Sequence, residues 1–398
     1  MKSRYLLCVV LLLSILLCAC TEGEYISPPT EKPSIESSGA VSSSVPQASE
    51  TAEKSDTESQ EPQKIVLPSS NDLQFTNEKN GIYNYCPVAM QLSDGTVYIY
   101  YCTNKESYKV IDYVGCRKGV RGEDGSIVWG EEKIVFSPSE SGWDSHHVCD
   151  PSVIAGDFEY GGEHYGYLLA YLGCTSYDNQ ENKIGIAVAN TPEGPFVRVG
   201  TKPLIDFVKD PSVSVFQWGV GQPSLVSLDK KGRVQLFYTR GDKDGTRLMM
   251  DEWELSDLDA PLKVSTTTVS RSGLRDLNDA LDFMNNADIV YDAESNRYYS
   301  TSDCHPNPES TPNFISSHFR INYFEKKASM MMVSWLPLIT VTPKITGFSR
   351  NHNTGFLRDQ YGHTTQNGYL TVFYTMSVTG NDSLWSYRIY DYNLKLAP

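Results

Sequence analysis

Three residues of this chain can give or take a proton and lie where short predicted strands begin. Asp150 precedes Pro151 in a Cys-Asp-Pro-Ser-Val stretch, Asp288 lies in Asn-Ala-Asp-Ile-Val, and His352 precedes Asn353. Carboxyl and imidazole groups act as general acids and bases when they are held near a reacting bond. Each also has a plainer explanation, because an Asp before a strand often caps a turn, and a loop His is often only hydrogen-bonded. We take Asp150, Asp288 and His352 as candidate catalytic residues.

The stretch around Asp150 is one copy of a repeat. Residues 85–88 read Tyr-Cys-Pro-Val, residues 149–153 read Cys-Asp-Pro-Ser-Val, and residues 221–225 read Gly-Gln-Pro-Ser-Leu. Fainter copies lie at residues 286–290 and 353–356. A recurrence every ~65 residues, with several short strands in each unit, is typical of a β-propeller with one blade per unit. Because a propeller gathers its innermost strands around one axis, the polar residues that open these strands should meet in one pocket.

The second unit shows the predicted strand order most clearly. Its four strands are predicted at residues 151–156, 165–173, 183–190 and 196–200. The turn between the first two strands is predicted at residues 161–162. Runs such as Val-Tyr-Ile-Tyr-Tyr at 97–101 alternate with the period of two that half-buried strands show. A second Asp-Pro-Ser-Val, at 210–213, has no turn and strand after it and is predicted to be a loop. Residues 71–398 are thus predicted to form an all-β fold, a five-bladed β-propeller with four-stranded antiparallel blades.

Two stretches of the second unit carry a family resemblance. One is Trp-Asp-Ser-His-His-Val-Cys-Asp-Pro-Ser-Val at 143–153, and the other comprises Ile-Gly-Ile-Ala-Val-Ala-Asn at 184–190 with Glu-Gly-Pro-Phe at 193–196. They resemble the five-bladed glycoside hydrolases of families 43 and 62 and relatives such as families 117 and 130. The resemblance implies hydrolysis of glycosidic bonds in plant or microbial oligosaccharides, as by xylosidases or arabinosidases. Two alternatives stay open: a propeller that binds carbohydrate without cleaving it, and a structural or protein-binding propeller.

The resemblance implies a set of catalytic carboxylates that this chain keeps only in part. In the family 43 enzymes that this chain resembles, the innermost strands carry a general base, an orienting Asp and a general acid. Asp150 stands at the orienting position, whereas Cys86 stands at the base position and Gln222 at the acid position. A glutamine cannot donate a catalytic proton, so the family's standard mechanism does not transfer. We expect Asp150 to stay ionised near neutral pH, with Asp288, His352 or the substrate as proton donor.

Five residues are predicted to bind substrate: Trp143, Asp144, Trp218, Gln222 and Arg358. Trp143 and Trp218 directly precede inner strands, and sugar rings stack their flat C–H faces on indoles; either Trp could instead close the gap between two blades. Arg358 could hold hydroxyls or a carboxylate in a bidentate fork, or it could pair with Asp359. Asp144 is expected at the rim of the pocket, and Gln222 at the axis.

The first residues are typical of a bacterial lipoprotein signal. Lys2 and Arg4 precede an apolar run at 6–17, too short to span a bilayer as a mature helix, and Ala19-Cys20 follows. Residues 1–20 are therefore predicted to be a signal peptide and Cys20 to carry lipid; the alternative is an ordinary secretory signal cleaved after Ala19. Residues 21–70 are rich in Ser, Glu and Pro and are expected to be a disordered tether. This predicts an extracytoplasmic protein, anchored by lipid to the membrane or surface of a bacterium.

Charge and cysteine content limit the classes of partner and ion that the protein is expected to bind. The 398 residues carry a net charge of −15, much of it in the tether, so nucleic acid is not an expected partner, because phosphate binding needs a basic face. We expect a monomer. Six of the nine cysteines follow the signal segment, where disulfides can form, and no two of these have the C-x-x-C spacing of a metal site. We therefore predict no metal among them; a structural calcium ion at the propeller axis is compatible with the predicted fold.

The predicted hairpin of the second unit also brings cysteines together. A turn at 161–162 places residues whose numbers sum to 323 opposite each other, and 149 plus 174 gives 323. Cys149 and Cys174 are therefore predicted to be near neighbours. Cys86 and Cys102 flank the Asp94-Gly95 turn in the same way, one position from ideal.

Overall fold

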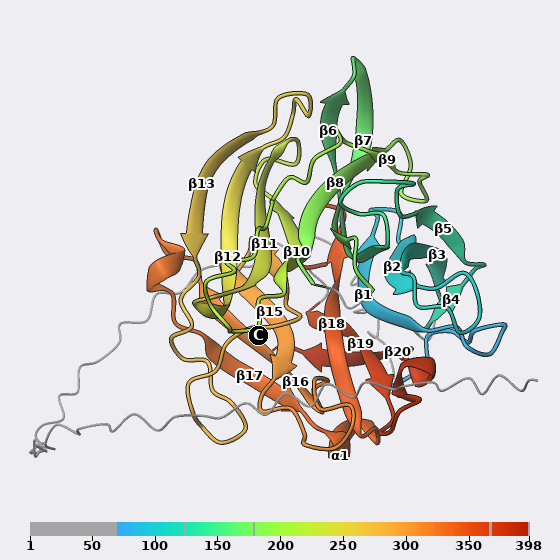
Figure 1. Ribbon diagram of the computed structural model, residues 1–398, viewed down its shortest axis with the longest axis vertical. Helices are drawn as coiled ribbons and strands as arrows, with labels where there is room; N and C mark the ends of the chain where they lie inside the picture. The colour runs from blue at the N-terminus through green and yellow to red at the C-terminus, as the bar shows by residue number, and fades with distance from the viewer. Residues whose placement is uncertain (1–69, 123–124, 178–179, 366–367, 397–398) are drawn as a thin grey trace, which may run out of the picture. The chain divides into compact units, whose positions relative to one another are not determined.

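β-strands run through most of the part of the chain that the structure describes (Figure 1), and many of their residues are aromatic or β-branched. The computed structural model describes residues 70–122, 125–177, 180–365 and 368–396. Within these ranges, helix is confined to α1 (Pro343–Thr346) and the 3-10 turns η1 (Met330–Met332) and η2 (Ser383–Ser386). None of these helices has the length and apolar character needed to cross a membrane. The prediction of an all-β fold is confirmed.

Three sheets have the predicted composition of four antiparallel strands joined in chain order. The first contains β6 (His147–Tyr160), β7 (Glu163–Cys174), β8 (Lys183–Ala189) and β9 (Val197–Arg198). The second contains β10 (Gly219–Ser227), β11 (Arg233–Asp242), β12 (Gly245–Glu254) and β13 (Leu262–Thr268). The third contains β14 (Asp288–Asp292), β15 (Arg297–Cys304), β16 (His318–Glu325) and β17 (Leu336–Val341). Residues 210–213 lie before β10 and form no strand, as predicted.

The fourth sheet has eight strands, because two segments far apart in sequence pair with each other. The parallel pair is β1 (Asn84–Gln91) and β18 (Arg350–Asp359), which lie side by side in Figure 1. One flank of this pair contains β2 (Val97–Thr103), β3 (Tyr113–Arg121), β4 (Ile127–Trp129) and β5 (Lys133–Phe136). The other flank contains β19 (Tyr369–Ser377) and β20 (Arg388–Lys395). Leu73 adds an antiparallel bridge to Tyr390 at the outer edge of β20.

Buried apolar side chains fill the space between neighbouring sheets. One such cluster joins Ile154 and Leu168 of the β6–β9 sheet to Leu236 and Trp253 of the next sheet. All four sheets belong to one compact unit, Gln63–Pro398. A second unit, Met1–Pro62, lies outside the described residues, as do the predicted signal peptide, Cys20 and nearly all of the predicted tether.

Two β-bulges shift the register of the long β6–β7 hairpin. Near the turn, Tyr160 lies opposite Glu163, and the numbers sum to 323, but beyond the bulges Cys149 lies opposite Leu172, and the sum is 321. Each bulge inserts one extra residue into one strand. The predicted pairing of Cys149 with Cys174 is therefore wrong, and Cys174 faces His147 instead.

Cys149 forms a disulfide with Cys102 of β2, and this bond joins the first sheet to the eight-stranded sheet. The two cysteines are 47 residues apart in sequence, a loop long enough for a cross-link to restrict the unfolded chain considerably. Cys86 occupies a bulge of β1 next to Tyr85, which lies opposite Cys102. The expected proximity of Cys86 and Cys102 is thus confirmed, because their sulfur atoms lie within 4.8 Å.

Removal of this disulfide should lower the stability of the protein. The double variant Cys102→Ser/Cys149→Ser is expected to lose roughly 2–4 kcal/mol of unfolding free energy, the usual scale for loops of this length. Urea unfolding followed by tryptophan fluorescence measures the difference. Reductant should bring the wild type down to the stability of the double variant and leave the double variant unchanged. Equal midpoints for the oxidised wild type and the double variant would show that the bond contributes no stability.

Candidate active site

Five residues in or just before β1, β6, β10, β14 and β18 share a left-handed backbone conformation. Their φ angles lie between +47° and +55°: Cys86, Asp150, Gln222, Asn286 and Asn353. Four of them fall where a β-bulge interrupts the pairing with the next strand, and Asn286 lies two residues before the start of β14. Such a conformation costs a non-glycine residue about 1–3 kcal/mol, and it persists mainly at sites where the surrounding structure imposes it. We call these five residues the axial ring, because all of them line one narrow cavity of about 40 Å³.

The five residues of the axial ring occupy the same position in the five copies of the repeat, the position of Asp150 in the second copy. In the two fainter copies, the residues at this position are Asn286 and Asn353. The sequence prediction instead selected Asp288 and His352, the nearest titratable residues. The register of the repeat was the signal that could have identified the two asparagines.

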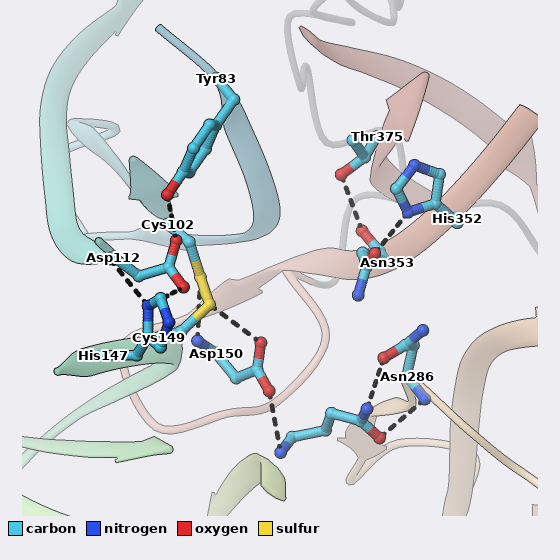
Figure 2. Close-up of a disulfide and its surroundings, with 11 residues drawn as sticks. Tyr83, Cys102, Asp112, His147, Cys149, Asp150, Asn286, His352, Asn353 and Thr375 are labelled. Carbon is cyan, nitrogen blue, oxygen red and sulfur yellow. Dashed lines mark hydrogen bonds and ion pairs between the residues drawn. A yellow bond between two sulfur atoms is a disulfide. The ribbon is translucent and has the colours of Figure 1, made fainter. Parts of the chain in front are cut away.

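A chain of hydrogen bonds links two carboxylates through the ring. The Gln222 backbone N–H donates to Asp150 Oδ2 at 3.2 Å, and the Gln222 side-chain amide donates to Asn286 Oδ1 at 2.5 Å. Asn286 Nδ2 in turn donates to Asp303 Oδ2 at 2.6 Å, and the Asn353 backbone N–H donates to Asp303 Oδ1 at 3.0 Å. Figure 2 shows Asp150 between the disulfide on one side and Asn286 and Asn353 on the other. Asp150 and Asp303 are thus held by the same network.

Two wider cavities are lined in part by residues of the axial ring. One, of about 560 Å³, is bordered by Asp150, Gln222 and Trp218, and also by the exposed rings of Phe216 and Phe314. The other, of about 440 Å³, is bordered by residues that include Asp303, Tyr85 and His352. The two cavities share four lining residues: Tyr85, Asn286, Phe314 and Asn353. They are therefore adjoining parts of one hollow that holds both carboxylates at its walls.

Burial changes the acidity of both carboxyl groups. It raises the pKa of Asp303 to about 7, and the hydrogen bonds from Asn286 and Asn353 only partly oppose this rise. It also raises the pKa of Asp150 to about 6, against hydrogen bonds from the Cys86 thiol and the Gln222 N–H. At pH 7 Asp150 is therefore mostly ionised, in line with the sequence-based expectation, whereas about half of Asp303 keeps its proton.

Asp303 is the residue that sequence reasoning missed. It lies near the end of β15, the second strand of its sheet, and not at the opening of an innermost strand. Asp303 is buried, with 3% of its surface exposed to solvent. Nothing in the surrounding Thr-Ser-Asp-Cys sequence marks it, since only the pairing of β15 with its neighbours brings it to the hollow.

Asp288 borders the same narrow cavity as the axial ring, but its carboxylate is engaged by groups of neighbouring sheets. Its carboxylate accepts hydrogen bonds from Ser224 Oγ at 2.6 Å and from the Phe356 N–H at 2.8 Å, and Arg358 Nη1 lies 3.3 Å away. Arg358 is completely buried and also donates to Ser152 Oγ at 2.8 Å. The two side chains link neighbouring sheets, and these contacts do not favour the predicted roles of Asp288 as catalyst and Arg358 as substrate fork, which stay predictions.

His352 borders the hollow but is unsuited to donate a proton at neutral pH. Burial lowers the pKa of its imidazole to about 4, so the ring is neutral at pH 7. Its Nδ1 contacts Asn353 Oδ1, and its ring packs edge-on against Tyr387. Among the described residues, its buried Nε2 has no hydrogen-bond partner. This lowered pKa does not favour the predicted role of His352 as an acid, which stays a prediction.

The two predicted tryptophans have different environments. Trp218 borders the wider cavity, and its indole lies directly on the backbone of β11, where a Cβ at Gly241 would come within 1.9 Å of Nε1. Trp143 is partly buried, stacks on Tyr171 and packs against the core, and these contacts do not favour its predicted role in binding substrate, which stays a prediction.

The remaining predicted rim residue, Asp144, is also structural. It is buried, accepts a hydrogen bond from Tyr171 Oη at 2.9 Å and pairs with Arg198 Nε at 2.7 Å. Asp359 does not pair with Arg358; its Oδ1 accepts the backbone N–H groups of Tyr361 and His363 in a turn. Of the predicted binding residues, Trp218 and Gln222 are the two that border the hollow.

The residues at the axis do not fit the calcium ion that the predicted fold allowed. The two carboxylates lining the narrow cavity are those of Asp150 and Asp288. Ca²⁺ takes about six to eight oxygen ligands. Asp288 is already neutralised by Arg358, whose positive charge opposes a second cation. The hydrolysis proposed for this protein does not involve calcium.

Comparison with solved structures finds a similar arrangement of sheets in several glycoside hydrolases. In fold, the chain resembles the five-bladed β-propeller glycoside hydrolases. It is similar to Zg3597, a family 117 glycoside hydrolase of the marine bacterium Zobellia galactanivorans, with a TM-score of 0.53 and 13% identity over 82% of this chain and 89% of that chain. It is also similar to an α-L-arabinofuranosidase from Lactobacillus brevis, with a TM-score of 0.52 and 9% identity over 78% and 90% of the two chains.

A third similar structure is an exo-β-1,3-galactanase from Phanerochaete chrysosporium bound to β-1,3-galactotriose. Its TM-score is 0.50, with 13% identity over 82% of this chain and 64% of that chain. No family model matches the sequence, and no curated protein is similar to it in sequence. At such low identities the likeness establishes the fold alone, so any activity must be argued from the site itself.

Proposed function

We propose that this protein is a glycoside hydrolase with a non-standard acid and base, in which Asp303 donates the proton and Asp150 acts as the base. The observation that carries the proposal is the placement of these two carboxylates. One hydrogen-bonded network through Gln222 and Asn286 holds both, and they border adjoining cavities of about 560 and 440 Å³. Cavities of this size accommodate ligands of a few rings.

The proposed chemistry gives each carboxyl a single task. The protonated Asp303 transfers its proton to the glycosidic oxygen as the bond between that oxygen and the anomeric carbon breaks. Asp150, ionised at neutral pH, accepts a proton from the water that attacks the anomeric carbon. The products are the free sugar and the departing alcohol, and the two carboxyl groups return to their starting states through solvent.

We propose oligosaccharides of plant or microbial origin as the substrates, with a xylosidase-like or arabinosidase-like action. Trp218, Phe216 and Phe314 provide aromatic surface at the wider cavity. Such rings stack on the apolar faces of sugars, while the amides of Asn286 and Asn353 can bond to hydroxyl groups. The fold shared with carbohydrate-active enzymes supports the same substrate class.

We also infer that the four sheets amount to five propeller blades. The eight-stranded sheet contributes two of them, because the parallel pair β1 with β18 divides its described strands into two antiparallel halves. The five left-handed residues of the axial ring, one at the opening of each innermost strand, support this count. The half containing β18 has three named strands and is extended by the bridge between Leu73 and Tyr390.

A carbohydrate-binding propeller without catalysis is the second candidate. The composition of the axial ring favours it, because Asp150 is the only carboxylate among five residues that otherwise offer a thiol and three amides. Amides can bind sugar hydroxyls as both donors and acceptors but cannot supply a proton.

A substrate screen separates these candidates. Purified protein would be incubated with aryl glycosides and with plant cell wall oligosaccharides, and products would be measured by chromatography and binding by calorimetry. Cleavage that Asp303→Asn abolishes supports the hydrolase. Binding with intact linkages supports the second candidate. A protein that neither cleaves nor binds any glycan contradicts both and favours a structural or protein-binding role.

We further propose that the protein is a monomer attached to the bacterial cell surface through lipid on Cys20. The motivation is the Ala19-Cys20 junction after a short apolar run. Labelling of expressing cells with a fatty-acid probe should tag the wild type. The Cys20→Ala variant should lose the label and be released or left unprocessed, whereas Cys18→Ala should keep it. A label that persists on Cys20→Ala would contradict the anchor.

A further inference from the structure

We propose that the Cys86 thiol, the Cys102–Cys149 disulfide and the Asp150 carboxylate form a redox-gated zinc site: reduction of the disulfide creates a three-thiol, one-carboxylate cluster that binds Zn²⁺. This inference does not depend on the proposed hydrolase activity.

The four groups already converge in the folded protein. The three sulfur atoms and a carboxylate oxygen of Asp150 all lie within 4.8 Å of one another. They come from β1, β2 and β6, so they belong to two different sheets. With metal–sulfur bonds of about 2.3 Å, ligand atoms at the corners of a tetrahedron are about 3.8 Å apart. No pair of these atoms is thus more than about 1 Å wider than that spacing, and the two bonded sulfurs must move apart once they are reduced.

The chemistry of the cluster selects the metal. Thiolates are soft ligands that favour zinc over calcium or magnesium, and four-coordinate sites of sulfur with one other ligand are typical of Zn²⁺. Cys102 and Cys149 are buried, while Cys86 is half-buried. Cys86, Cys149 and Asp150 all border the cavity of about 560 Å³, which gives the ion a path from solvent.

Reduction of the Cys102–Cys149 disulfide needs an external reductant to supply the electrons. A dithiol reduces the Cys102–Cys149 bond by giving up two electrons and two protons, and it is itself oxidised to a disulfide. Zinc binding then releases protons from the thiols that become ligands. The oxidised protein lacks two of the four ligands, because sulfurs bonded to each other are not thiolates. The disulfide therefore acts as the gate.

Occupation of this site would engage Asp150. The carboxylate that borders the hollow would become a zinc ligand, and Cys86, at the mouth of the axial ring, would be fixed beside it. Zinc binding under reducing conditions would thus change the wall of the cavity in which sugars are proposed to bind.

Cobalt and zinc titrations test the site without reference to catalysis. The folded protein is reduced with a phosphine, which becomes phosphine oxide, and titrated with Co²⁺, whose thiolate complexes absorb visible and near-ultraviolet light. We expect one Co²⁺ per protein, displaced by one equivalent of Zn²⁺, and a zinc-dependent rise in the unfolding temperature of the reduced wild type. The oxidised wild type should bind neither metal.

Cysteine variants assign the ligands. Reduced Cys86→Ser should bind Zn²⁺ at least ~100-fold more weakly, since loss of even a supporting partner of a ligand costs about 10–100-fold. Reduced Cys304→Ser, which removes a buried cysteine elsewhere, should bind like the wild type. The proposal is overturned if the oxidised wild type binds equally well, if Cys86→Ser retains full affinity, or if reduction abolishes the native circular dichroism. Failure of the hydrolase proposal would leave these readouts unchanged.

Discussion

Replacement of Asp303 by Asn is expected to lower kcat on a cleaved glycoside by ~10²–10⁴-fold, the usual contribution of a general acid. Asn cannot deliver the proton, but it fits the space and can keep an oxygen toward the Asn353 N–H. Because the pKa of Asp303 is about 7, the kcat of the wild type should fall tenfold per pH unit above about pH 7. The residual activity of Asp303→Asn should lack this fall. Both are measured from initial rates between pH 5 and pH 9.

A matched variant tests whether the effect belongs to this carboxyl. Asp112 also borders the 440 Å³ cavity, but its oxygens are engaged by Tyr83 Oη at 2.7 Å and by His147 Nδ1 at 2.8 Å (Figure 2). Asp112→Asn should therefore change kcat less than tenfold while lowering stability. Equal losses of kcat in Asp112→Asn and Asp303→Asn would contradict the assignment of Asp303 as the acid.

Stability gives a second readout for Asp303 that needs no substrate. Burial raises its pKa from the ordinary value of 3.8 to about 7 in the folded protein, so between about pH 4 and pH 7 the folded chain binds more protons than the unfolded chain. The contribution of this group to stability is therefore fully present below about pH 4 and is lost as the pH rises toward 7. Relative to the wild type, Asp303→Asn should be more stable at pH 8 than at pH 5. An unfolding-temperature difference that does not change with pH would mean that the pKa is not raised.

Replacement of Asp150 by Asn is expected to lower kcat by ~10²-fold or more, since the variant keeps the shape of the side chain but loses the negative charge of the base. Its amide oxygen can still accept the Gln222 N–H, so the fold and the axial ring should be preserved. Steady-state kinetics on the best substrate of the screen and calorimetry with its product measure turnover and affinity separately.

Asp144 provides the contrast for Asp150. It carries the same group six positions earlier in the chain, but it is buried against Arg198 and Tyr171. Asp144→Asn should lower the unfolding temperature and leave the kcat of the folded protein nearly unchanged, the opposite of Asp150→Asn. If Asp150→Asn leaves turnover and glycan affinity intact, Asp150 merely shapes its β-bulge.

Local sequence predicted the strands well, because alternation and turn signals act over a few residues. The run at 97–101 became β2, and the turn at Gly161-Gly162 joins β6 to β7 as expected. The strand bounds were less accurate: β6 begins at His147 and continues to Tyr160, well beyond the predicted 151–156. Two bulges within this strand were not predicted, and they are what displaced Cys149 from Cys174.

The sequence predicted part of the candidate site, from the repeat and from the stacking chemistry of Trp218, which borders the wider cavity. Asp150 and Gln222 follow from the copies with proline, and both lie in the axial ring. Asp288 and His352 were chosen for their chemistry, against the register of the repeat. The structure places Asp288 in a buried pair with Arg358, and it leaves His352 neutral at pH 7.

The sequence by itself determined the all-β character, the repeated unit and the place of Cys86, Asp150 and Gln222 in it, because these depend on periodicity and on turn signals that act over a few residues. Only the tertiary structure decided which side chains meet across strands far apart in sequence. It joined Cys102 to Cys149 beside Cys86, and it brought Asp303 from the second strand of its sheet into the network of Asp150. The physical reason is that register shifts and burial, which set both the contacts and the pKa values of these groups, arise only when the sheets pack together.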